Sequence, residues 1–164
     1  MKIALVLTTL VVVASAGAAG TPGSSPSFKV SREFDLSAKS AQSVALADLN
    51  GDGKLDAVAV HGADFPPQLR ALRAVSVLLG RGDGRLGPSH IYEIGQPGDE
   101  VGAWSIATGD LTGDGKPDVA TGNIVAKSIS VLVNGGHGTL EPPVNYSIDR
   151  EPSDIAIADL NGDG

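Results

Sequence analysis

The chain has 164 residues, a formal net charge of −7 and no cysteine, which excludes disulfide bonds and thiol chemistry. Aromatic residues make up only 4% of the sequence, so a buried core must be built from valine, isoleucine, leucine and alanine. An acidic chain without a basic stripe argues against nucleic acid as a partner.

The N-terminal residues have the pattern of a targeting segment. Lys2 precedes an apolar run, Ile3–Val13, and small residues with Ala-x-Ala cleavage options follow. Residues 1–20 are therefore predicted to be a secretory signal peptide, and residues 21–27, rich in Ser, Pro and Gly, a flexible leader. The apolar run is too short to span a bilayer, and no transmembrane segment is predicted after signal cleavage. We expect a secreted, extracellular protein, or one in a periplasm or at a cell surface.

The rest of the chain consists of short apolar runs with a period of two, which is typical of β-strands rather than helices. Strand, acidic loop, strand, surface loop and hairpin follow one another from residue 42, and the same order recurs from residue 103. A third unit begins after residue 152 and is incomplete. The resulting division of residues 28–164 is an N-terminal strand (28–41), a first repeat (42–102), a second repeat (103–152) and a truncated third repeat (153–164).

Self-similarity at a period of roughly fifty residues, with four strands per unit, indicates a β-propeller or a stack of blades. One small antiparallel sheet cannot bury both of its faces, so each unit must pack against its neighbours. The predicted fold class is all-β: a partial β-propeller of about two to three four-stranded antiparallel blades.

The most informative stretch is the acidic loop Asp48-Leu-Asn-Gly-Asp-Gly-Lys-Leu-Asp56, which recurs at Asp110–Asp118 and begins again at Asp159. Oxygen-bearing side chains occupy alternate positions, which is the spacing of a loop that wraps a hard cation such as Ca²⁺. An EF-hand is excluded because its twelfth position is Ala59 or Thr121 rather than glutamate, and because strands flank the loop. A plain Asn-Gly hairpin turn is the alternative, but such a turn does not need the flanking aspartates.

The predicted metal ligands are Asp48, Asn50, Asp52, the Lys54 carbonyl and Asp56 in the first loop, Asp110, Thr112, Asp114, the Lys116 carbonyl and Asp118 in the second, and Asp159, Asn161 and Asp163 in the third. Because Thr112 replaces Asn50, we expect weaker binding in the second loop. The third loop is incomplete.

These residues resemble a known family. The first acidic loop, the strand Val75-Ser-Val-Leu-Leu-Gly80 and the turn Gly82-Asp-Gly84 are similar to the FG-GAP/VCBS repeat, and the resemblance extends over about residues 28–164. It implies an integrin-α-like β-propeller, commonly of seven blades, with Ca²⁺ in the loop between the first two strands of a blade. It also implies that this sequence is a fragment of such a propeller.

No Gly-x-Ser-x-Gly, His-Glu-x-x-His or phosphate-loop motif is present, so an enzyme is not expected. We expect an exported calcium-binding module for adhesion or for binding an extracellular protein or glycan. The alternatives are a scaffold or accessory domain of a secreted polysaccharide-acting or other hydrolytic enzyme whose catalytic part lies elsewhere, and a structural array in a surface layer. Arg81-Gly82-Asp83 is interpreted as turn chemistry rather than receptor recognition, because the second repeat has Gly135-Gly-His at that place.

Overall fold

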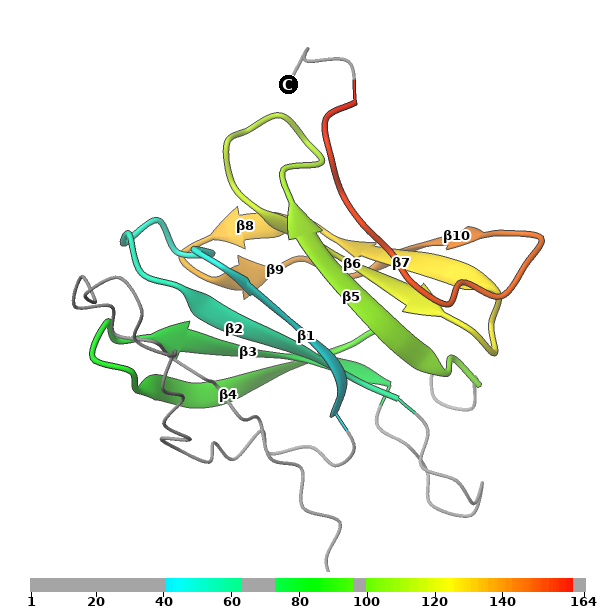
Figure 1. The fold of residues 1–164 in the computed structure, drawn as a ribbon, viewed down its shortest axis with the longest axis horizontal. Helices are drawn as coiled ribbons and strands as arrows, with labels where there is room; N and C mark the ends of the chain where they lie inside the picture. Colours follow the sequence, from blue (N-terminus) through cyan, green and yellow to red (C-terminus); the bar gives the residue numbers. More distant parts are fainter. Residues whose placement is uncertain (1–40, 63–72, 96–99, 161–164) are drawn as a thin grey trace, which may run out of the picture.

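The computed structural model describes residues 41–62, 73–95 and 100–160, and the regular structure in these ranges consists of β-strands (Figure 1). The strands are β1 (Ala41–Ala47), β2 (Asp56–His61), β3 (Ala74–Gly80), β4 (Leu86–Glu93), β5 (Ala103–Gly109), β6 (Asp118–Asn123), β7 (Ser128–Leu132), β8 (Asn134–Gly136), β9 (Thr139–Leu140) and β10 (Val144–Ser147). Within these ranges no helix is long and apolar enough to cross a membrane. The predicted signal peptide, the leader and residues 28–40 of the predicted N-terminal strand lie outside the described residues, and Ala41 is the first residue of β1.

Each of the two complete repeats forms its own four-stranded antiparallel sheet. Strands β1 to β4 pair in sequence order, and the second sheet has the order β10-β7-β6-β5. We call the first sheet blade 1 and the second, together with the β8–β9 hairpin, blade 2. The all-β prediction with four-stranded blades is thereby confirmed. Residues 153–160, the described part of the predicted third repeat, form no strand in this structure.

The central strands of blade 1 follow from their composition. Val58 and Val60 of β2 pair with Val77 and Val75 of β3, so four β-branched side chains cover one face of the sheet. Because side chains alternate between the faces, the small residues of β2, including Ala57, lie on the other face. Every residue of β2 is buried, which explains why this strand is almost continuously apolar.

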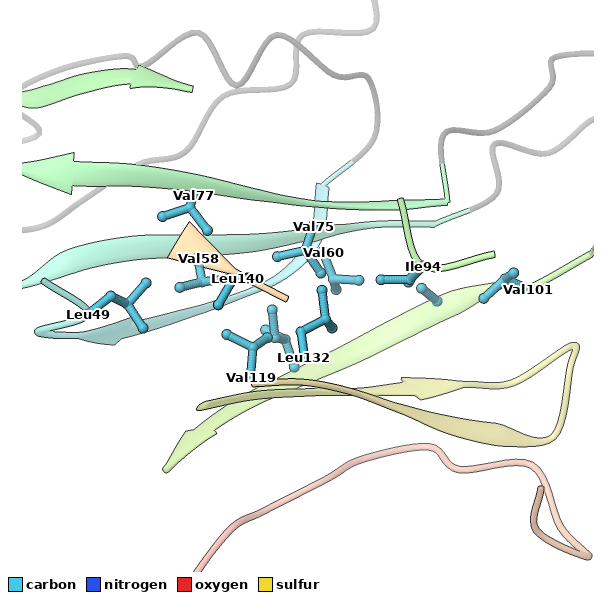
Figure 2. Close-up of a cluster of buried hydrophobic side chains, with 12 residues drawn as sticks. Leu49, Val58, Val60, Val75, Val77, Ile94, Val101, Val119, Leu132 and Leu140 are labelled. Carbon is cyan, nitrogen blue, oxygen red and sulfur yellow. The ribbon is translucent and has the colours of Figure 1, made fainter. Parts of the chain in front are cut away.

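The main core lies between the two blades (Figure 2). The valine face of blade 1 meets side chains of blade 2 that include Val119 and Leu132, and the first strands of the two blades, β1 and β5, approach each other closely. A fully buried Val or Leu contributes about 1.5–3 kcal/mol relative to an exposed one. This cluster is therefore the main source of cohesion between the blades, and it positions the two acidic loops.

Candidate metal centre

The first acidic loop connects β1 to β2 and closes around the Asp48 carboxylate. Oδ1 of Asp48 accepts hydrogen bonds from the backbone N–H groups of Gly51 (2.8 Å) and Asp52 (3.1 Å), and Oδ2 accepts one from Gly53 (2.7 Å). Gly51 and Gly53 have φ angles of 75° and 79°, a region that glycine adopts without a Cβ clash. The glycines of the sequence motif therefore allow the backbone to present its amides to one carboxylate.

The second loop, between β5 and β6, has the same construction. Oδ1 of Asp110 accepts the N–H groups of Gly113 (2.7 Å) and Asp114 (3.2 Å), and Oδ2 accepts that of Gly115 (2.7 Å). The hydrogen bond from Gly115 is the chief reason why the pKa of Asp110 lies below its ordinary value. The replacement of Asn50 by Thr112 leaves this loop geometry intact.

The middle aspartate of each loop forms an ion pair with the lysine two residues further along the chain. Oδ2 of Asp52 lies 2.8 Å from Nζ of Lys54, and Asp114 makes the same ion pair with Lys116. The hydrogen bond from the Lys54 side chain lowers the pKa of Asp52, and the same bond raises the pKa of Lys54. Both aspartates are thus held ionised at a partly exposed site, where a cation is already present as part of the protein.

The last aspartate of each loop has a different environment, because Asp56 and Asp118 are completely buried. Oδ2 of Asp56 accepts the N–H of Leu49 (2.9 Å), and Oδ1 accepts that of Gly80 at the end of β3 (2.7 Å). Asp118 makes the same two bonds, to the N–H groups of Leu111 and Asn134. A buried carboxylate therefore ties the first loop to the end of β3 and the second loop to the start of β8.

The predicted ligands of each complete loop are thus brought to one end of its blade, but their oxygens face protein groups. Among the described residues, no three His, Cys, Asp or Glu side chains are grouped so as to hold a metal ion. The chemistry of the donors nevertheless suits Ca²⁺, because all of them are oxygens and the exposed carboxylates are ionised. The ammonium groups of Lys54 and Lys116 mark where a cation is attracted. Of the third loop, Asp159 is exposed, and Asn161 and Asp163 lie outside the described residues.

The Arg81-Gly82-Asp83 tripeptide forms the exposed turn between β3 and β4. Asp83 accepts the N–H of Arg85 (3.0 Å) and lies 3.6 Å from its Nε, while the N–H of Arg81 bonds to the Arg85 carbonyl (2.9 Å). The aspartate therefore shapes the turn itself, in agreement with the interpretation as turn chemistry.

One residue that the sequence analysis did not single out, Asn134, joins the first acidic loop to the neighbouring blade. Nδ2 of Asn134 donates to the carbonyl oxygens of Leu49 (2.9 Å) in blade 1 and Pro117 (3.0 Å) in its own blade. The only sign of this in the sequence is that Asn134 stands where the first repeat has Gly80.

Comparison with protein families identifies residues 70–121 as an FG-GAP-like repeat. This segment includes β3 and β4 of blade 1, β5, the second acidic loop and the first part of β6. The predicted resemblance to this repeat is confirmed over this segment, which is less than half of the chain. Comparison with curated proteins and with solved structures gave no match.

Proposed function

We propose that the chain is an exported, calcium-stabilised β-propeller-like repeat module that presents its loops to an extracellular protein or glycan. The observation that carries the calcium part is the shared construction of the two acidic loops. In each loop the first aspartate accepts hydrogen bonds from backbone N–H groups of the loop, and the middle aspartate accepts one from a lysine ammonium group. A site that attracts one cation in this way is suited to Ca²⁺ in its place.

Calcium binding is compatible with the hydrogen bonds inside the loops. Each carboxylate oxygen has two lone-pair sites, so Asp48 and Asp56 can keep their amide bonds while they bind a metal ion. Asn50, Asp52 and the carbonyl of Lys54 would complete the first site, and the corresponding residues of Asp110–Asp118 the second. The ion would act structurally, because it offsets repulsion between carboxylates in a loop that joins two strands.

The proposed binding role rests on the resemblance to the FG-GAP-like repeat and on the exposure of the two acidic loops. Gly51–Leu55 and Leu111–Lys116 are exposed in their respective blades, so both loops are available to a partner. Surface loops on a rigid sheet scaffold are where binding residues concentrate. Export is supported by the signal-like pattern of residues 1–20.

Calorimetric titration of the full chain with Ca²⁺, with thermal melting alongside, tests the proposal. We expect Ca²⁺ to raise the melting temperature, and at ten times a Kd of about 10⁻⁴–10⁻³ M each site would add about 1.4 kcal/mol. Asp52→Ala and Asp114→Ala should each remove one site, whereas Asp83→Ala, at an exposed aspartate outside the acidic loops, should remove none. A folded protein that gives no binding heat and no change in melting temperature would refute the calcium sites.

Export has a separate test. N-terminal sequencing of the protein recovered outside the cells is expected to show a mature chain without residues 1–20. A chain that stays inside the cells and still begins at Met1 would contradict export without affecting the calcium result.

A further inference from the structure

The two acidic loops are connected by the side chain of one buried residue, Asn134 of blade 2. Its Nδ2 group donates one hydrogen bond to each loop, to the carbonyl oxygen of Leu49 in the first (2.9 Å) and to that of Pro117 in the second (3.0 Å). Its Oδ1 accepts the N–H of Gly136 (2.9 Å). Both donors of the amide are therefore in use, and each holds the backbone of a different loop.

The hydrogen bonds continue from Asn134 to a predicted metal ligand on either side. In the first loop, the N–H of Leu49 is donated to Oδ2 of Asp56 (2.9 Å). In the second, the N–H of Asn134 itself is donated to Oδ1 of Asp118 (2.8 Å). The last aspartates of the two loops are thus joined by a continuous path that contains only Leu49 and Asn134.

All members of this path are shielded from water. Leu49 and Asn134 are each 1% exposed, and Asp56 and Asp118 are completely buried. The side chain of Leu49 also packs in the cluster that includes Leu140 of blade 2 (Figure 2). Because water cannot replace a bond that is lost here, a displacement at one end of the path has to be followed by the groups bonded to it.

Blade 1 shows the same position without the connecting amide. Gly80 corresponds to Asn134, since the N–H of each bonds to the buried aspartate that ends the acidic loop of its blade. A glycine makes this bond with its backbone alone, so the bond does not need a side chain. The amide of Asn134 is therefore an addition whose bonds lead to the other loop, and it can be removed without removing the backbone bond to Asp118.

We propose that Asn134 couples the two acidic loops energetically. For Ca²⁺ this inference rests on the proposed function, and it means that an ion in one loop strengthens binding in the other. An ion in the first loop would fix Asp56 and, through Leu49, the carbonyl that Asn134 holds. Asn134 is then already ordered beside Asp118 when the second ion binds, so the second binding step costs less conformational freedom. Such coupling is reciprocal, because each site must raise the affinity of the other by the same factor.

Calorimetric titration of the full chain with Ca²⁺ tests the coupling. In Asp52→Ala, which removes the first site, the second site should bind about fivefold more weakly than in the wild type with its first site occupied. Asp114→Ala should weaken the first site by the same factor. In Asn134→Gly, which introduces the residue that blade 1 has at this position, each site should bind independently of the other. Asn134→Ala repeats this test with a less flexible backbone.

A matched control separates coupling from general stability. Leu140→Ala creates a cavity in the contact between the blades but keeps the amide of Asn134, so it should lower the melting temperature and leave the fivefold effect in place. A second site that binds equally well with and without the first would overturn the proposal. Coupling that survives in both Asn134 variants, or that Leu140→Ala abolishes to the same extent, would also overturn it.

Unfolding in EDTA supplies a readout that needs no metal. Asp56→Asn and Asp118→Asn change the two ends of the path, and substitutions within one hydrogen-bond network are not additive. The double variant should lose less stability than the sum of the two single losses, because the first substitution already loosens bonds that the second would break. In the Asn134→Gly background the losses should add. Additive losses in both backgrounds would overturn the coupling. Non-additive losses without any Ca²⁺ binding would refute the calcium sites and support the coupling through Asn134.

Discussion

The substitution Asp56→Asn tests whether the last aspartate of the loop has a structural role of its own. The side chain is completely buried, and each of its two oxygens accepts a backbone N–H, from Leu49 at 2.9 Å and from Gly80 at 2.7 Å. An asparagine has one acceptor oxygen, so one of these N–H groups would face an amide NH₂ and lose its partner. A buried donor left without an acceptor costs about 1–3 kcal/mol, and the remaining bond loses its charge assistance.

We therefore expect Asp56→Asn to lower the free energy of unfolding by about 2–4 kcal/mol. At roughly 4 °C per kcal/mol for a domain of this size, the melting temperature would fall by about 8–16 °C. Thermal and urea unfolding are measured in EDTA, so that no metal contributes. Asp118→Asn, which disturbs the same pair of bonds in blade 2, should have a similar effect, and Asp52→Asn at the exposed ion pair serves as the control.

The outcome in EDTA decides the role of Asp56. If Asp56→Asn is as stable as the wild type in EDTA and differs only in the presence of Ca²⁺, the carboxylate acts as a metal ligand alone. The reasoning from its two amide bonds would then be refuted. A loss in EDTA that grows further in Ca²⁺ would mean that the carboxylate has both roles.

Three further predictions concern the contact between the blades and the electrostatics of the loops. Gly138→Ala should destabilise the chain more than Gly84→Ala, because both glycines have φ near 75° but only a Cβ on Gly138 would collide with Leu79. Urea unfolding of the two variants checks this. Equal losses in the free energy of unfolding would contradict it. Lys54→Met should tighten Ca²⁺ binding at the first loop, since it removes the ammonium group that competes for Asp52 and keeps the backbone carbonyl of residue 54. Calorimetry that shows equal or weaker Ca²⁺ binding would argue against that competition. In EDTA, stability should fall as the pH is lowered, because the Lys54 hydrogen bond keeps the folded pKa of Asp52 below its ordinary value of 3.8. This contribution is complete above that value and is lost as the pH drops through the folded pKa, so Lys54→Met should flatten the acid side of the stability profile.

Much of the architecture follows from local sequence alone. The period-two runs predict strands, and the repeated order of loop and hairpin predicts two four-stranded blades. Both features depend on residues close together in the chain, since alternation puts apolar side chains on a common face of a strand. The closure of the first loop around Asp48 is equally local, because the amides that it binds are only three to five residues away.

Other features depend on which strands become neighbours, and only the tertiary structure decides this. Asp56 bonds to Gly80, 24 residues further along the chain, and its spacing in the motif suggests a metal ligand rather than a buried link between loop and strand. The bond between Asn134 and Leu49 joins residues 85 positions apart. No local pattern contains such a pair, because it arises from the packing of blade 2 on blade 1. The sequence therefore determined the repeated unit and its loop chemistry, and the tertiary structure decided how each loop is fixed to its own blade and to the next.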